Sequence, residues 1–120
     1  MNIFISPRIE PGKYIFKKDT PLFRRRPDLK AIFVEQILEA CISQTTLREL
    51  VCIMRGIWPS LPTYGLRKYL FYLIKYYLIT YHGQNKVYVS TNAGLELLYR
   101  IKKEKKVRQT SVEDIVIAFE

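Results

Sequence analysis

The sequence predicts a mainly α-helical domain with one small β-hairpin, preceded by an N-terminal arm and followed by a C-terminal helix. Three observations predict this fold class. Four segments have apolar residues at helical spacing, two alternating β-branched and aromatic runs flank a Gly/Asn turn, and four prolines fall within the first 27 residues. The length of 120 residues is that of a single ordinary domain.

Residues 1–27 are predicted to form a basic arm. Pro7, Pro11, Pro21 and Pro27 interrupt any helix there, because proline lacks an N–H and disfavours helical geometry in the residue before it. Within the arm, residues 13–17 are compatible with a short edge strand. The arm ends in a basic run, Arg24, Arg25 and Arg26, just before the predicted domain at 28–106.

Two helices follow the arm. Asp28 is a candidate N-cap for a first helix over about residues 29–42. A polar break at residues 43–46 separates it from a second helix. Thr46 and Glu49 match the T-x-x-E capping box at the start of that helix, and Gly56 is its expected C-cap.

The third predicted helix, residues 63–78, has the most complete amphipathic pattern. Its apolar stripe runs through positions i, i+3, i+4, i+7, i+8 and i+11. The stripe consists of Leu66, Tyr69, Leu70, Leu73, Ile74 and Tyr77. The residues expected to face outward are Thr63, Tyr64, Arg67, Lys68, Phe71 and Lys75.

A β-hairpin over residues 79–90 and a fourth helix come next. The hairpin turn contains Gly83 and Asn85. Thr91 is the expected cap of the fourth helix, with Leu95, Leu98 and Ile101 on its inner face and lysines at its C-terminal end, near residue 106. In the C-terminal segment 107–120, the amphipathic pattern of residues 111–119 fits either a helix or a strand.

Three helices, a hairpin and a further helix are the element order of a winged helix-turn-helix. Residues 66–79 (LRKYLFYLIKYYLI) and 90–98 (STNAGLELL) resemble two stretches common in prokaryotic winged-helix regulators. Thr91, Gly94, Leu97 and Leu98 match the pattern T-x-x-G-x-x-L-L, whereas Tyr77 stands where those families often have glycine. Over about residues 28–106 the chain is similar to the MarR-like and PadR-like superfamily and to small archaeal, viral and plasmid winged-helix regulators.

The resemblance implies that helix 63–78 enters the major groove of double-stranded DNA with its N-terminal residues nearest the bases. Arg67 is then the candidate for a bidentate contact to guanine, and Lys68 and Lys75 are candidates for phosphate contacts. The hairpin would lie on the backbone or in the minor groove, and the arginine run would track the flanking minor groove. The expected DNA-contacting residues are Thr63, Tyr64, Arg67, Lys68, Lys75, His82, Gln84, Asn85, Lys86, Arg24, Arg25 and Arg26.

The charge distribution favours a polyanionic partner. The chain has 20 Lys and Arg against 11 Asp and Glu, a net charge of +9. The excess is concentrated in residues 1–27, at +5, and 63–106, at +7, while residues 28–62 carry −1 and residues 107–120 carry −2. Nucleic acid is the first expectation and an anionic membrane surface the second.

Enzyme chemistry and cofactor or metal sites are not expected. One histidine and two cysteines provide neither a metal cluster nor a nucleophile–base pair. Cys41 and Cys52 are expected to be buried, inert thiols in a reducing, cytoplasmic protein. The absence of a long apolar run argues against a transmembrane helix or a secretion signal.

The preferred function is therefore a homodimeric, DNA-binding transcriptional regulator. Residues 1–27 and 107–120 are the expected dimer elements, since Ile115, Val116 and Phe119 are too apolar to remain in water. The alternative is a winged-helix module for protein–protein contacts in a larger assembly. Phe71 and Tyr76, which lie off the core stripe, favour that alternative. No feature assigns a small-molecule effector.

Overall fold

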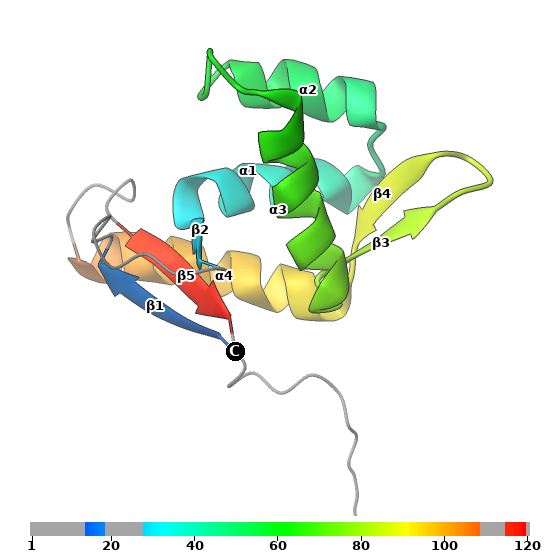
Figure 1. The fold of residues 1–120 in the computed structure, drawn as a ribbon. Helices are drawn as coiled ribbons and strands as arrows, with labels where there is room; N and C mark the ends of the chain where they lie inside the picture. Colours follow the sequence, from blue (N-terminus) through cyan, green and yellow to red (C-terminus); the bar gives the residue numbers. More distant parts are fainter. Residues whose placement is uncertain (1–13, 19–27, 109–114, 120) are drawn as a thin grey trace, which may run out of the picture.

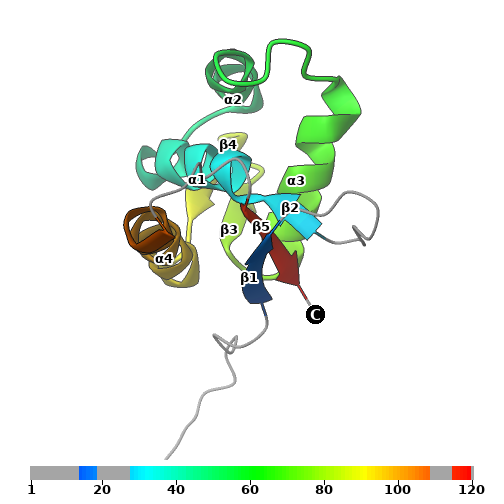
Figure 2. The same cartoon turned by 90° about the vertical axis from the view of Figure 1, so that its left-hand side faces the viewer.

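The structure is a computed structural model that describes residues 14–18, 28–108 and 115–119. These residues form a mixed α/β fold with two small antiparallel sheets (Figures 1 and 2). The elements are β1 (Tyr14–Lys18), β2 (Asp28–Lys30), α1 (Ala31–Ala40), a 3-10 turn (Cys41–Ser43), α2 (Leu47–Arg55), α3 (Thr63–Lys75), β3 (Ile79–His82), β4 (Val87–Ser90), α4 (Asn92–Arg108) and β5 (Ile115–Phe119).

A three-stranded sheet in the order β1-β5-β2 replaces the predicted C-terminal helix. That prediction was wrong because β5 is the central strand, and four of its five residues, all except Ala118, are buried. A surface helix over this segment would leave one face exposed to solvent. A central strand rich in β-branched residues is instead buried on both faces of the sheet. The expected edge strand is confirmed as β1, with Tyr14 opposite Phe119.

The start of the first helix also differs from the prediction. Asp28 is the first residue of β2, not an N-cap, and its carboxylate lies 3.4 Å from Lys17 Nζ of β1, the strand on the other side of β5. Lys30 occupies the N-cap position of α1 without a side-chain cap, and its N–H donates to the Tyr69 hydroxyl at 2.9 Å. Strand pairing with β5 has therefore overridden the local capping signal.

The second helix begins as predicted. The Glu49 N–H donates to Thr46 Oγ1 at 3.2 Å, and the Thr46 N–H donates to Glu49 Oε1 at 3.0 Å. This reciprocal pair is the expected capping box. The Thr46 backbone and the Thr45 hydroxyl, both bonded to the Glu49 carboxylate, lower its pKa.

The third helix ends earlier than predicted, in a tight turn. Tyr77 has a φ of 62°, and the Leu78 N–H donates to the Leu73 carbonyl at 2.8 Å. This left-handed residue closes the helix as glycine commonly does. Ile74 and Tyr77 were expected in the apolar stripe but are 38% and 66% exposed. Tyr77 lies beyond the end of α3, in the turn, so it does not continue the stripe.

The hairpin is confirmed as β3 and β4, with Tyr81 opposite Tyr88. After it, Thr91 Oγ1 donates to the Tyr77 carbonyl at 2.7 Å and accepts from the Gly94 N–H at 3.0 Å. Thr91 therefore caps α4 and also ties that helix to the end of α3. Leu95 is 40% exposed, contrary to its predicted inner position, and Leu97 is buried in its place.

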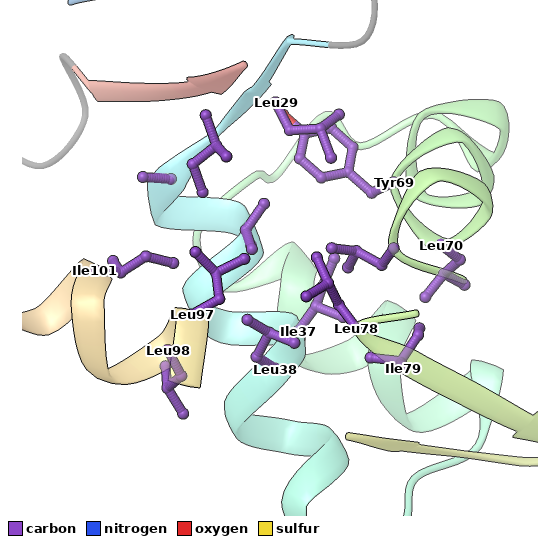
Figure 3. Packing of buried hydrophobic residues seen from close by; sticks show 14 of the residues in the cluster. Leu29, Ile37, Leu38, Tyr69, Leu70, Leu78, Ile79, Leu97, Leu98 and Ile101 are labelled. Carbon is purple, nitrogen blue, oxygen red and sulfur yellow. The ribbon is translucent and has the colours of Figure 1, made fainter. Parts of the chain in front are cut away.

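One hydrophobic core joins the helices to both sheets (Figure 3). Leu29 of β2, Ile37 of α1, Leu73 of α3 and Leu97 of α4 are completely buried in it. Trp58, in the connector before α3, packs at its edge and stacks on Phe33 with ring centroids 4.5 Å apart. The buried side chains of α3 pack into this core, with Tyr69 against Phe33 of α1, and this packing sets the orientation of the helix.

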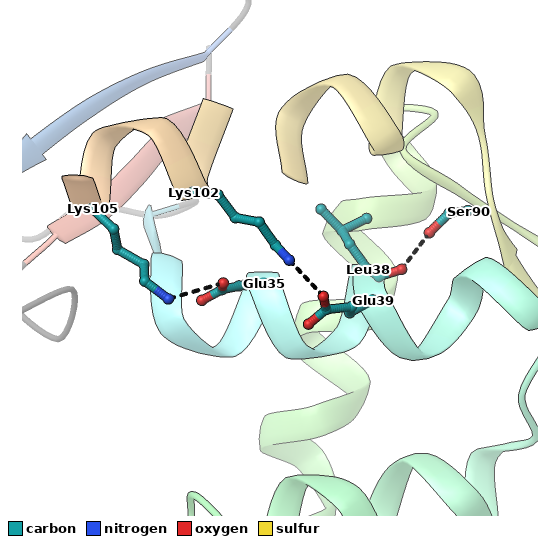
Figure 4. A network of polar contacts seen from close by, with 6 residues as sticks. All are labelled: Glu35, Leu38, Glu39, Ser90, Lys102 and Lys105. Carbon is teal, nitrogen blue, oxygen red and sulfur yellow. Dashed lines mark hydrogen bonds and ion pairs between the residues drawn. The ribbon is translucent and has the colours of Figure 1, made fainter. Parts of the chain in front are cut away.

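Ion pairs hold α4 against α1 (Figure 4). Lys105 Nζ lies 3.2 Å from the buried Glu35 carboxylate, and Lys102 Nζ lies 2.6 Å from Glu39. The hydrogen bond to Glu39 raises the pKa of Lys102. Two of the lysines in the C-terminal part of α4 are thus paired within the molecule.

Candidate nucleic-acid interface

The outward face of α3 carries both cations and aromatic rings. Tyr64, Lys68, Phe71 and Lys75 are spaced at i, i+4, i+7 and i+11, so they lie along one side of the helix, with Arg67 beside them. All five side chains are exposed, including Tyr64 at 76%. Since the opposite side of α3 is buried, the apolar stripe of the sequence fixes which residues point into solvent.

Aromatic neighbours orient the far end of this face. Lys75 Nζ lies 5.9 Å from the ring centroids of both Tyr72 and Tyr76, a cation–π distance. The Tyr76 ring in turn stacks on Phe119 of β5, with centroids 4.6 Å apart. The three-stranded sheet therefore borders one side of the α3 face.

The β3–β4 hairpin borders the other side (Figure 1). The predicted residues His82, Gln84, Asn85 and Lys86 are all exposed at its turn. His82 Nε2 lies 3.2 Å from the Thr80 hydroxyl, which fixes the ring along the strand. The structure thus gathers the predicted hairpin residues at one projecting tip.

An open groove of ≈ 600 Å³ separates the hairpin from the start of α2. Two backbone hydrogen bonds between Thr45 and Tyr88, of 3.1 and 2.7 Å, fix its walls. The lining residues are Thr46, Leu47, Arg48, Tyr81, Asn85, Lys86 and Tyr88. The groove therefore has a cation on each wall, one from α2 and one from the hairpin turn.

Arg48 is a candidate interface residue that the sequence prediction missed. Since Thr46 is the N-cap, the capping box indicates only that Arg48 lies in the first turn of α2. Its position relative to the hairpin depends on the Thr45–Tyr88 bridge, which no local pattern indicates.

Electrostatics connect α3 with the hairpin. Burial raises the pKa of the Tyr88 hydroxyl, and the positive charge of Arg67 acts on the same hydroxyl in the opposite direction. The guanidinium of α3 is thus close enough to β4 to influence it. Arg67 of the α3 face therefore lies within electrostatic range of Tyr88 in the hairpin.

Two parts of the predicted site have no described side chains. Thr63 is the first residue of α3, and its side chain is not described. The arginine run at 24–26 lies outside the described residues. The candidate interface accordingly rests on α3, the hairpin and the start of α2.

Three further observations concern metal ligands, membrane-spanning helices and the cysteines. The part of the chain that the structure describes contains no group of three or more His, Cys, Asp or Glu residues placed to hold a metal ion. Within that part, none of the helices has the length and apolar character needed to cross a membrane. Cys41 is buried as expected, but Cys52 is exposed on the outer side of α2, so that half of the cysteine prediction was wrong.

Comparisons with protein-family models, curated proteins and solved structures give no match to this chain.

Proposed function

We propose that this protein is a winged-helix DNA-binding protein, acting as a transcriptional regulator in the cytoplasm. In this proposal α3 enters the major groove, and the β3–β4 hairpin follows the backbone or the minor groove. The supporting observation is the exposure of Arg67, Lys68 and Lys75 on the outward face of α3, beside a hairpin whose turn carries Lys86.

The charge of this surface supports a nucleic acid over an uncharged partner. Residues 63–90 contain no Asp or Glu, so no carboxylate from α3 or the hairpin opposes a phosphate there. Lys102 and Lys105, by contrast, are paired with carboxylates of α1. The α3 and hairpin cations thus form the more available basic surface.

The test is a fluorescence-anisotropy titration against random and genomic duplexes at several salt concentrations. Duplex binding should weaken as salt rises, with a log–log slope of about −0.9 for each phosphate contacted. Arg67→Ala should relax sequence preference at one position, corresponding to about 1–3 kcal/mol, because it removes a bidentate base contact. Lys68→Ala should weaken binding to all sequences and reduce the slope by about 1.

Lys103→Ala is the matched control, since it removes an exposed cation from α4, outside both the α3 face and the hairpin. It should leave sequence preference unchanged. Binding that is undetectable even at low salt would reject the proposal. Equal effects of the Arg67 and Lys103 substitutions would reject the assigned docking face.

We also propose that the regulator binds as a homodimer, because one such module contacts few base pairs. The argument from an apolar C-terminal tail no longer supports this, since Ile115, Val116, Ile117 and Phe119 are buried within one chain. Light scattering of the protein alone and with duplex tests the stoichiometry. A single protein chain on every specific duplex would overturn this part of the proposal.

The second candidate function is a protein–protein interaction module. The observation that favours it is the exposure of Tyr64, Phe71 and Tyr77, at 76%, 59% and 66%. Exposed aromatic side chains are typical of protein interfaces. Absence of duplex binding in the titration above would make this candidate the preferred one.

A further inference from the structure

The outward face of α3 contains an apolar side chain that charge recognition does not explain. Phe71 is 59% exposed and lies four residues after Arg67 and three after Lys68, so it shares their side of the helix. Lys75, one turn further on, leans over the Tyr72 and Tyr76 rings. The Phe71 ring therefore remains open to whatever α3 binds.

The Phe71 ring is also held in place. It packs edge-to-face against Tyr72, with centroids 5.2 Å apart and an interplanar angle of 76°. Tyr72 is half-buried against the core. Such support reduces the freedom that the ring loses on binding, which favours a specific contact over a loose one.

The surroundings of Phe71 favour DNA over protein as its partner. Lysine is depleted in the centre of protein–protein interfaces, yet Lys68 and Lys75 lie one turn to either side of this ring. Residues 63–78 contain no acidic residue that could neutralise them. A partner that covers this face has to place negative charge near the lysines and an apolar group against the Phe71 ring.

The major groove offers that combination, because the thymine C5-methyl group is the distinctive apolar feature of its base edges. We propose that Phe71 is a specificity-determining residue that packs against a thymine methyl group in the bound duplex. This inference rests on the proposed function and adds the base that the middle of α3 reads. Phe71 lies four residues beyond Arg67, about 6 Å along the helix axis. The thymine is therefore expected about two base pairs from the guanine contacted by Arg67.

The experiment uses duplexes that the full-length protein enriches from a random-sequence pool. The enriched pool is copied once with dTTP and once with dUTP, which differ only by the thymine methyl group. The wild-type protein should bind the thymine copy about fourfold more tightly, the amount expected for one buried methyl group. Phe71→Ala should bind both copies equally while keeping the salt dependence of the wild type.

Two further variants make the result specific. Phe71→Leu keeps an apolar side chain and should retain a preference for the thymine copy. Tyr99→Ala removes an aromatic side chain of similar exposure, 65%, from α4 and should bind like the wild type. Circular dichroism of each variant verifies its folding, which an exposed substitution should preserve.

The outcomes separate this inference from the proposed function. If the wild type enriches duplexes but binds the thymine and uracil copies equally, the thymine contact is overturned and DNA binding stands. If Phe71→Ala still prefers thymine, another residue reads the methyl group and the assignment to Phe71 is wrong. If no duplex is enriched at any salt concentration, the proposed function fails and the inference fails with it.

Discussion

Gly94, in the first turn of α4, lies very close to Leu78, just beyond the end of α3. A Cβ atom at position 94 would overlap the Leu78 carbonyl oxygen and would crowd the Leu38 side chain. Thr91 bonds the same turn through its hydroxyl, which also accepts from the Gly94 N–H. The T-x-x-G pattern therefore has a structural reason in this chain: it lets the start of α4 abut the end of α3.

We expect Gly94→Ala to lower the free energy of unfolding by about 2–3 kcal/mol, because the added methyl group has to displace backbone. Urea denaturation followed by circular dichroism measures this change. Gly83→Ala is the matched control, since a methyl group there would lie at ordinary contact distance, 3.7 Å from the Tyr81 ring. It should alter stability by no more than about 0.5 kcal/mol. Equal effects of the two substitutions would contradict the close-approach explanation.

The two cysteines differ in accessibility and in acidity. Burial raises the pKa of the Cys41 thiol to about 12, whereas Cys52 is exposed. Because the thiolate is the reactive form, a thiol reagent at about pH 8 should label one cysteine per native chain and two per denatured chain. Mass spectrometry of the labelled protein should place the native label on Cys52.

The raised pKa of Cys41 also predicts the pH dependence of stability. A group whose pKa is raised by folding contributes stability that is complete below its unfolded value, 9.0, and is lost as pH rises towards about 12. The midpoint of urea denaturation should fall over that range, and less so in Cys41→Ala. In the labelling experiment described above, rapid reaction of both thiols in the native protein would contradict the burial of Cys41.

At the scale of elements, we expect β5 to contribute more to stability than its length of five residues suggests. It supplies the middle strand of the β1-β5-β2 sheet, and Ile117 is completely buried opposite Phe16 and Leu29. Ile117→Ala should lower the free energy of unfolding by about 2–5 kcal/mol, because it leaves a cavity between covered faces. Chemical denaturation measures this loss.

Ile15→Ala provides the comparison for that substitution. Ile15 lies in the edge strand β1 of the same sheet and is 52% exposed. Its truncation should cost about 0.5 kcal/mol. If Ile15→Ala destabilises the protein as much as Ile117→Ala, the central position of β5 does not govern its contribution.

The elements also differ in how far the sequence predicts them. The capping box of Thr46 and Glu49, the hairpin turn and the apolar stripe of α3 are local signals, and each element they predict is present. The three-stranded sheet depends instead on pairing between residues 14–18, 28–30 and 115–119, which are far apart in the chain. No local periodicity indicates such pairing, so Asp28 was interpreted as a helix cap, and the pattern of residues 111–119 did not decide between a helix and the strand that is present.

The candidate site follows the same division. The exposure of Arg67, Lys68 and Phe71 follows from the stripe of α3, so the sequence was sufficient to predict it. Arg48 and Lys86 line the same groove because the long-range bridge between Thr45 and Tyr88 joins the start of α2 to the hairpin. Side chains on one helix were therefore predictable, and their partners on other elements were not.

At the scale of the whole molecule, the sheet and the helical part share packing through the rear of α3. Tyr76, the C-cap of α3, stacks on Phe119 of β5, and Tyr14 of β1 lies under the Arg100 guanidinium of α4. Phe119 also packs edge-to-face with Tyr14. Because these contacts link both terminal strands to the helices, the described part of the molecule should unfold as one cooperative unit.

A chain ending at residue 108 tests this cooperativity. It lacks β5 and thus four buried side chains, whose loss should remove more than about 4 kcal/mol, much of the stability of a typical domain. Trp58 is the single tryptophan of the protein and packs on Phe33, outside the sheet. Its fluorescence should nevertheless show a far lower urea midpoint in the shortened chain, and a peptide of residues 109–120 added in excess should restore part of the loss. An unchanged Trp58 midpoint would mean that the sheet is an independent appendage and that the orientation of α3, with its basic face, does not depend on it.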